Sequence, residues 1–406
     1  MNRRSRTWRQ RLAIGGLSLL TLLLLLSAAA VGYVANVLSR IDRVDVALDP
    51  VEVPVEVDID GDGEPDQVII GDSEEQELGP AGPPRNFLIV GSDDVSGVAA
   101  DDAILSGRDD EIGQSLADTI MLLRVEPADG SAQLLSIPRD LWVEIVDDDG
   151  NFFGKVNGAF NLEDEDERAD RLTATVREAL DVPINHYVHV NWDGFRDLVD
   201  IVGGVDVCFE QPQRDLETGF LVDAAGVEEL DGDEALAYVR SRRMQGQDDD
   251  GVWRSLGVNS DLERIDRQQD FLRLVIDQTG DLRGLGNVRQ LQQLVDSALA
   301  NVEIDGSLAL GDVFDLVRRY GAFGGDDLET YSLEVVDVRR GELDTLDLVD
   351  SATNQTVLDL FRGIAPPPPS TTVPPSTTAA PAATAPPTTA APTTTTEPPS
   401  SICPPS

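Results

Sequence analysis

The chain has 406 residues, of which 75 are acidic and 31 basic, giving a formal net charge of −44. This charge repels nucleic acid and argues against a nucleic-acid partner, and a phosphate-rich ligand would need a local island of positive charge. Lys155 is the only lysine in the sequence, so arginines must form that island. With only two histidines, the composition also argues against a histidine-rich metal site or a histidine-centred triad.

The N-terminus has the pattern of a membrane anchor. Residues 1–11 contain five arginines, and residues 12–38 form an uncharged, mainly apolar stretch. About 20 apolar residues span a bilayer as a helix, and positive charge stays on the cytoplasmic side. We therefore expect a single-pass cell-membrane protein with a cytoplasmic N-terminus and an extracytoplasmic main domain. A cleaved signal peptide is the alternative, but its apolar core is normally about 7–15 residues long.

Residues 39–85 are acidic and rich in Gly and Pro, which predicts a stalk. Within it, Asp58, Asp60 and Asp62 match the first half of a calcium loop, in which alternate carboxylates converge on one ion. Ile69 stands where such a loop has its bidentate Glu. The pattern therefore favours a solvated acidic turn over a calcium site.

From residue 86 onward, predicted strands alternate with predicted helices. Short apolar runs predict buried strands at 86–90, 119–125 and 132–137. Helical spacing predicts helices at 171–180, 192–202, 231–239 and 261–278. This alternation predicts an α/β fold, an α-β-α sandwich with a central mixed sheet. The main domain then covers 86–278, 279–363 form a helical part of the same globule, and 364–406 form a disordered Pro/Thr tail.

Five segments, in this order, carry a family resemblance. They are NFLIVGSD, ADTIMLLRVEP with LLSIPRDLWVEI, GKVNGAF with VPINHYVHVNWDGFRDLVDIVGGVDV, LDGDEALAYVRSR, and DLERIDRQQDFL. Through them the sequence resembles the LytR-CpsA-Psr family of the actinobacterial type, well over 86–278 and more loosely beyond. The resemblance implies a phosphotransferase that moves a glycopolymer from a polyprenyl-pyrophosphate carrier in the membrane to a hydroxyl of peptidoglycan or another wall acceptor.

Arginine suits a diphosphate because its planar fork forms paired hydrogen bonds with phosphate oxygens and keeps its charge. By resemblance, the diphosphate contacts are Arg139, Arg240, Arg242, Arg264, Arg267 and Gln268. Asp93 and Asp118 lie at the end of the first predicted strand and the start of the second, so adjacent strands would bring them together. One or two carboxylates plus substrate phosphates typically bind Mg²⁺. We therefore expect Mg²⁺ or Mn²⁺ at Asp93 and Asp118, and a catalytic set of Asp93, Asp118 and Arg139.

Other polar residues have simpler interpretations. Asp261 is expected to cap its helix rather than to act in catalysis. His186 and His189 alternate along a predicted strand, where we expect them to pack or to form hydrogen bonds. Cys208 and Cys403 are too few for a disulfide scaffold, and their bonding stays open. Many actinobacterial relatives have a cysteine at the position of Val227, which could pair with Cys208.

Two departures from the family pattern leave two functions open. Family members usually carry arginines at the positions of Val95 and Leu116, where both would help to position the diphosphate. Arg108, in the intervening loop, could substitute for them. The first function is the enzyme described above. The second is a catalytically weakened relative that binds polyprenyl phosphate and regulates or scaffolds wall assembly.

Overall fold

The computed structural model describes the greater part of the chain between residues 42 and 364. The described residues are 42–50, 54–57, 66–69, 83–93, 116–128, 130–162, 164–257, 261–281, 302–308 and 323–364, with Asp312, Leu316, Tyr320 and Cys403. The expected anchor (12–38), the acidic turn (58–65) and nearly all of the tail lie outside these residues. Within the ranges given, none of the helices is both long and apolar enough to cross a bilayer.

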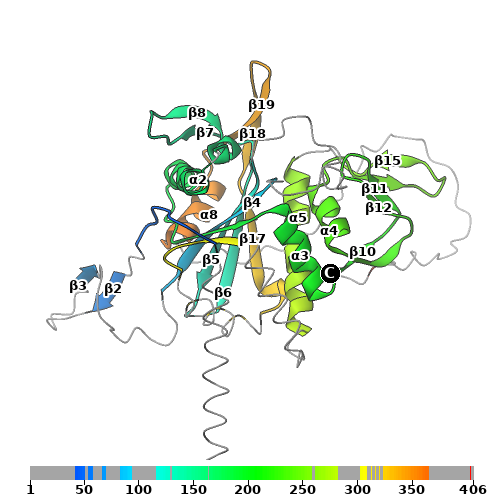
Figure 1. Ribbon diagram of the computed structural model, residues 1–406, viewed down its shortest axis with the longest axis horizontal. Helices are drawn as coiled ribbons and strands as arrows, with labels where there is room; N and C mark the ends of the chain where they lie inside the picture. Colours follow the sequence, from blue (N-terminus) through cyan, green and yellow to red (C-terminus); the bar gives the residue numbers. More distant parts are fainter. Residues whose placement is uncertain are drawn as a thin grey trace, which may run out of the picture.

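A mixed sheet forms the centre of the molecule (Figure 1). Over the described residues it has seven strands in the order β1-β16-β9-β4-β5-β6-β17. In that order their bounds are Asp42–Val44, Val302–Asp305, His186–Val190, Arg85–Ser92, Ala117–Glu126, Ser131–Ile137 and Leu328–Ser332. β4, β5 and β6 pair antiparallel, whereas β1 with β16, β9 with β4, and β6 with β17 pair parallel. The predicted mixed α/β architecture is thus confirmed.

Helices cover both faces of this sheet. α2 (Glu165–Leu180) and α8 (Ala352–Arg362) lie on one side, while α3 (Trp192–Val202), α4 (Gly232–Arg240) and α5 (Asp261–Asp281) lie on the other (Figure 1). α2 begins six residues before the predicted start at 171. The Asp164 carboxylate accepts a hydrogen bond from the Glu167 N–H, and the acidic first turn is favoured by the helix dipole.

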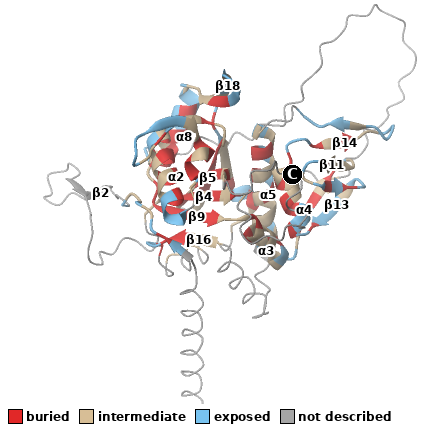
Figure 2. Ribbon diagram, turned by 45° about the horizontal axis from the view of Figure 1, so that its top comes forward, coloured by how far each residue is buried: buried red, intermediate tan, exposed pale blue. Residues whose placement is uncertain are grey.

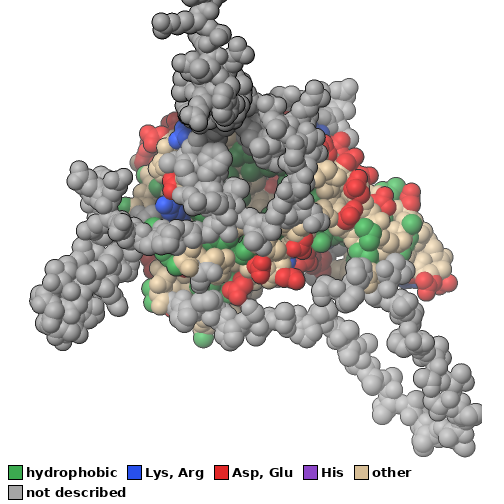
Figure 3. All heavy atoms as spheres, turned by 90° about the horizontal axis from the view of Figure 1, so that it is seen from below, with side chains coloured by type: hydrophobic (Ala, Val, Ile, Leu, Met, Phe, Trp, Pro, Cys, Tyr) green, Lys and Arg blue, Asp and Glu red, His purple; other side chains and the backbone are tan. Residues whose placement is uncertain are grey.

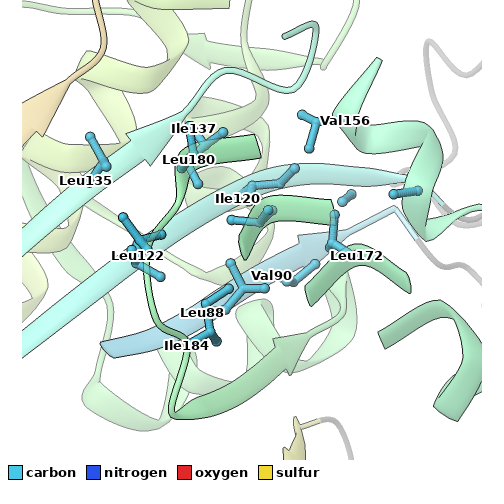
Figure 4. Packing of buried hydrophobic residues seen from close by; sticks show 14 of the residues in the cluster. Leu88, Val90, Ile120, Leu122, Leu135, Ile137, Val156, Leu172, Leu180 and Ile184 are labelled. Carbon is cyan, nitrogen blue, oxygen red and sulfur yellow. The ribbon is translucent and has the colours of Figure 1, made fainter. Parts of the chain in front are cut away.

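The largest apolar core lies between the sheet and the layer of α2 and α8 (Figures 2 and 4). Alternate residues of β4 and β5, including Leu88, Val90, Ile120 and Leu122, point into it and are almost fully buried. Each such side chain stabilises the fold by roughly 1.5–3 kcal/mol relative to exposure to water. The opposite face of β4 and β5 packs in part against Leu272 of α5.

The segment after residue 301 differs in part from the predicted helical pattern over 279–363. Asp312, Leu316 and Tyr320 are helical, but they lie between two strands of the central sheet, β16 and β17, and a hairpin of β18 (Val335–Arg340) and β19 (Leu343–Leu348) precedes α8. The two sheet strands are short, and the hairpin turns at Gly341, whose φ is +65°. Short strands with polar residues on both faces have no clear period of two, so their sequence does not exclude a helix.

Smaller elements complete the fold. A hairpin of β7 (Trp142–Ile145) and β8 (Phe152–Lys155) and the 3₁₀ helix η2 (Val156–Phe160) lie beside α2. Beyond α3 and α4, a lobe of short strands packs around its own core. Its strands are β10 (Val205–Phe209), β11 (Gln213–Asp215), β12 (Phe220–Val222), β13 (Gly226–Leu230), β14 (Gln245–Gln247) and β15 (Trp253–Ser255). Two further strands, β2 (Pro54–Val57) and β3 (Asp66–Ile69), pair only with each other.

Candidate functional site

The predicted catalytic carboxylates lie at one end of the central sheet, where β4 and β5 pair irregularly. Gly91 pairs with Thr119 and Ser92 with Ala117, so Asp118 is left out of the ladder as a bulge. Asp93 follows β4 directly, and its Oδ1 accepts a hydrogen bond of 2.9 Å from the Leu116 N–H. The two carboxylates therefore belong to the same strand ends, as adjacent strands predict.

Arg139 connects these strands to the rest of the site. It follows β6, and its Nη1 forms an ion pair with Asp118 Oδ1. Its Nε lies 3.3 Å from Asp261 Oδ1, and its side chain is only 15% exposed. Burial acts to lower the pKa of Arg139, but the nearby carboxylates, Asp118 foremost, outweigh it and raise that pKa above its ordinary value.

Arg264 is the most deeply buried cation of the site. Its Nη2 lies 2.9 Å from Asp261 Oδ1 and donates a 2.8 Å hydrogen bond to the backbone carbonyl of Asp118. The side chain is 4% exposed, and burial lowers the pKa of this guanidinium below its ordinary value. Asp261 thus does more than begin α5, because its carboxylate lies between two arginines. The cap interpretation of Asp261 missed this contact.

The remaining predicted contacts on α5 bond to the protein itself. Arg267 Nη1 donates to the Ser241 carbonyl, and Gln268 Nε2 donates to Thr119 Oγ1 at 3.1 Å and to the Val239 carbonyl at 3.3 Å. These bonds connect α5 to the start of β5 and to the end of α4. In this arrangement, Arg267 and Gln268 hold the elements of the site together.

The end of α4 carries the last two predicted arginines. The Arg240 guanidinium stacks over the Trp192 ring, with its carbon 3.6 Å from the ring centroid. Arg242 is exposed, and its charge contributes to the lowered pKa of Arg264, which burial chiefly causes. Arg242 therefore lies near the buried cluster. Among the cations that the sequence predicts for the site, it is the one whose side chain is mainly in solvent.

The turn that holds Arg242 is shaped by a residue that the sequence did not single out. Asp215 is 1% exposed, and its Oδ2 accepts hydrogen bonds from Ser241 Oγ at 2.5 Å and from the N–H groups of Arg242 and Arg243 at 3.2 and 2.9 Å. Burial acts to raise the pKa of Asp215, but these hydrogen bonds, that of Ser241 first, outweigh it and lower the pKa.

Lys155 also belongs to the site. Its Nζ lies 2.6 Å from Asp140 Oδ1, and Asp140 Oδ2 lies 3.8 Å from Arg139 Nε. The ion-paired cluster, defined here as Asp118, Asp140, Arg139, Lys155, Asp261 and Arg264, therefore contains three carboxylates and three cations. On the face seen from below, patches of acidic side chains are more prominent than basic ones (Figure 3). The three cations of the cluster are thus balanced by its three carboxylates, in a chain whose formal net charge is −44.

The carboxylates suit a divalent ion only in combination with a ligand. Over the described ranges, no group of three or more His, Cys, Asp or Glu residues is placed to hold a metal ion. Asp93 and Asp118 supply two carboxylates, and Mg²⁺ commonly takes its other ligands from substrate phosphates and water. The donor set therefore fits an ion that arrives with, or is completed by, a phosphate.

Of the two positions where the family usually has an arginine, Leu116 is the one that the structure describes. Its N–H donates to Asp93 Oδ1, and its carbonyl accepts from the Asp93 N–H at 3.3 Å. An arginine at position 116 would therefore lie directly beside Asp93. Val95 and Arg108 lie outside the described residues.

The cysteine pairing is resolved by the structure. Cys208 on β10 forms a disulfide with Cys403, and within β10 and β13 it lies opposite Val227. A cysteine at position 227, which the resemblance leads one to expect, would therefore face Cys208 across the two strands. In this chain Cys403 takes that place and joins the C-terminal tail to the lobe that follows α3.

Comparisons with known proteins identify the family of the chain. The model of the LytR_cpsA_psr family matches residues 62–358. The probable cell wall biosynthesis protein LcpB of Corynebacterium glutamicum is 36% identical over 191 residues, 47% of this chain and 41% of its own length. The polyisoprenyl-teichoic acid–peptidoglycan teichoic acid transferase TagV of Bacillus subtilis is 28% identical over 242 residues, 59% of this chain and 56% of its own. The match thus spans about half the length of these relatives.

The fold is also similar to that of solved structures. The LytR-Csp2A-Psr enzyme from Actinomyces oris superposes with a TM-score of 0.53 at 21% identity, covering 79% of this chain and 96% of that one. At this identity the similarity concerns the fold. It supports the mixed α/β architecture described above.

Proposed function

The chain belongs to the LytR_cpsA_psr family, and from this membership we propose that it transfers a phosphoglycopolymer from a polyprenyl-pyrophosphate carrier to a hydroxyl of peptidoglycan or another wall acceptor. Relatives named as teichoic acid transferases and as a cell wall biosynthesis protein support a wall-directed transfer. The observation that carries the proposal is the ion-paired cluster, in which Arg139 and Arg264 meet Asp118 and Asp261 at the end of the sheet.

The proposed reaction is a phosphoryl transfer. The acceptor hydroxyl oxygen attacks the phosphorus that bears the glycopolymer, the bond from that phosphorus to the bridging oxygen breaks, and polyprenyl phosphate leaves with the electron pair. The hydroxyl proton passes to a carboxylate, Asp93 or Asp118. Mg²⁺ or Mn²⁺, bound by these two carboxylates and the diphosphate, would neutralise charge that develops on the phosphoryl oxygens.

The arginines change partners in this proposal. Before the ligand binds, the Arg139 guanidinium is ion-paired with Asp118. A diphosphate oxygen competes for the same guanidinium, because phosphate accepts its forked hydrogen bonds equally well. Asp118 is then released for a proton or a metal ion, while Asp261 keeps Arg264 in place. Arg242, in solvent at the edge of the cluster, completes the cationic side of the site.

Localisation is part of the proposal. The lipid carrier lies in the membrane, and the N-terminal sequence has the length and flanking charge of a single-pass anchor. We expect the main domain to lie outside the cytoplasm. A periplasm- or exterior-active reporter fused after residue 406 should be active, and activity of a cytoplasm-only reporter at the same place would contradict this topology.

The test of the function uses the full chain in detergent or liposomes, a polyprenyl-pyrophosphate-linked glycopolymer, and peptidoglycan. Transfer should require Mg²⁺ or Mn²⁺ and should be abolished by EDTA. Arg139→Lys keeps the charge beside Asp118 but loses the fork, so transfer should fall at least ten-fold, a loss of about 1.4 kcal/mol. Arg254→Lys is the matched control, because Arg254 is an exposed residue paired with Asp248 away from the cluster.

The same assay separates the second function. A chain that binds polyprenyl phosphate through this site but transfers nothing with either metal is a binding relative that regulates or scaffolds wall assembly. The observation that favours this alternative is Leu116, since the structure places it beside Asp93 where the family usually has an arginine.

A further inference from the structure

Behind the candidate site, on the other face of the sheet, four polar side chains lie in a row of close contacts, three of them buried and the fourth, Glu303, 16% exposed. Ser92 Oγ lies 2.7 Å from His189 Nε2, and His189 Nδ1 lies 2.9 Å from Glu303 Oε2. Glu303 Oε1 in turn lies 3.2 Å from Arg168 Nη2. The hydrogen bond and the ring contact of His189 agree with the expectation that the two histidines pack or form hydrogen bonds. One of the two histidines has a serine and a carboxylate on its two ring nitrogens.

The burial of Ser92 and His189 excludes Ser92 as a nucleophile. Ser92 is 0% and His189 2% exposed, and the His189 ring packs on Phe160 of η2 with a centroid separation of 5.2 Å. Residues 88 and 90 of the same strand point into the main core beneath α2. By strand alternation Ser92 points to that side as well, and Asp93 follows the strand directly and bonds to Leu116.

One hydrogen bond in this row joins Ser92 Oγ and His189 Nε2. His189 Nδ1 faces the Glu303 carboxylate, whose Oε2 accepts no hydrogen bond from the described residues, so this contact is electrostatic. Arg168 compensates the charge of Glu303 from α2. His189 and Glu303 are direct partners in the antiparallel ladder of β9 and β16, so the row joins four elements: α2, β16, β9 and the end of β4.

Ser92 lies at the point where the pairing of β4 and β5 shifts in register. It pairs with Ala117 on the far side of the register shift that leaves Asp118 as a bulge. The next residue, Asp93, exchanges hydrogen bonds with Leu116. A change in the placement of Ser92 therefore moves both carboxylates of the candidate site at once.

We propose that Ser92 and His189 are positioning residues, which lock the bulge at the end of β4 and β5 and thereby hold Asp93 and Asp118 in the geometry needed for phosphoryl transfer. This inference rests on the proposed function for its catalytic consequence. Its structural content is the row of polar contacts behind the sheet, and the residues of that row lie outside the site.

The test compares Ser92→Ala and His189→Gln with a matched control, His186→Gln. His186 lies on the same strand and is 6% exposed, and its Nδ1 lies 3.2 Å from Asp305 Oδ2 on the same neighbouring strand. It is three residues from His189, toward the other end of β9. All three variants lose one buried hydrogen bond, so similar decreases in Tm, roughly 2–4 °C for each kcal/mol lost, are expected.

Of the three variants, only Ser92→Ala and His189→Gln should affect the candidate site. Their kcat should fall on the order of ten- to a hundred-fold, as expected when reacting groups are displaced by about 1 Å, with KM for the lipid donor within two-fold of the parent. Amide exchange at Asp93 and Leu116 should accelerate, and Mn²⁺ should bind more weakly in the presence of polyprenyl phosphate. The double variant should lose no more kcat than the more damaged single variant, because one hydrogen bond is lost twice.

Three results would overturn the proposal. They are a kcat loss equal to that of His186→Gln, unchanged amide exchange at Asp93 and Leu116, or losses that multiply in the double variant. If the parent itself transfers nothing, the proposed function fails instead. Amide exchange and Mn²⁺ binding then decide the positioning role, since neither requires turnover.

Discussion

The exposed cation of the site offers the sharpest test of where the diphosphate binds. Arg242 and Arg243 are neighbours on one turn, both exposed, and both donate their backbone N–H to Asp215. They differ in where their charge lies. Arg243 forms an ion pair with Glu217, whereas the charge of Arg242 acts on the buried Arg264. Replacing each by Ala therefore removes the same charge from the same turn, once toward the cluster and once away from it.

The size of the effect follows from the contact that is lost. A hydrogen bond to a charged group contributes about 1.5–3 kcal/mol, and solvent exposure places Arg242 at the low end of this range. We therefore expect Arg242→Ala to weaken polyprenyl-phosphate binding about ten-fold, since each factor of ten corresponds to about 1.4 kcal/mol. Arg243→Ala should stay within two-fold of the parent. Neither variant should change stability by more than about 0.5 kcal/mol, as is usual for surface positions.

The assay is equilibrium binding of a polyprenyl phosphate to the full chain, by calorimetry or fluorescence, at two salt concentrations. Because exposed charges are screened beyond about 10 Å at 0.1 M salt, the difference between the variants should shrink as salt is raised. Equal Kd values for Arg242→Ala and the parent would refute a diphosphate site at this edge of the cluster. Equal weakening in both variants would show that net charge, and not a contact of Arg242, attracts the lipid.

Further predictions concern the missing arginines, a buried carboxylate and the cysteines. The double variant Val95→Arg with Leu116→Arg should raise pyrophosphate hydrolysis ten-fold or more in Mg²⁺, with little change in lipid affinity, because added donors act on charge that develops in the transition state. Phosphate release measures this rate. A parent protein that already hydrolyses pyrophosphate rapidly, with no increase in the double variant, would contradict the prediction. Asp215→Asn should lower the free energy of unfolding by about 1–3 kcal/mol at neutral pH. Because the pKa of Asp215 is lowered in the folded state, its contribution is present above about pH 4 and is lost as pH falls through the folded pKa, so urea unfolding should converge for parent and variant in acid. Thiol titration of the denatured, unreduced chain should find none in the parent and one after Cys403→Ser, because Cys208 loses its partner.

Local sequence was enough to predict the elements that carry the site. The strand predicted at 86–90 lies within β4, and the helix predicted at 261–278 lies within α5. Apolar periodicity and capping residues act over a few positions, so they can be recognised in a single segment. The order of the family motifs likewise indicated the family and the mixed α/β fold. Asp93 and Asp118 were expected together because they stand at the ends of neighbouring strands.

The tertiary structure alone decided which charges meet. Arg264 bonds to the carbonyl of Asp118 across 146 positions of the chain, and Asp261 lies between two arginines although its sequence context suggests only a helix cap. With 75 acidic residues present, the sequence offers each arginine many partners and no way to rank them.

The same holds for the row of polar side chains behind the site. His189 and Glu303 become neighbours only because β9 and β16 pair, and β16 belongs to a segment whose pattern predicts helix. Hydrogen bonds and ion pairs act over about 3 Å, whereas sequence patterns report which face of an element is apolar. Sequence thus determined the family and the elements that carry the site, and the packing of distant strands decided which polar side chains can work together.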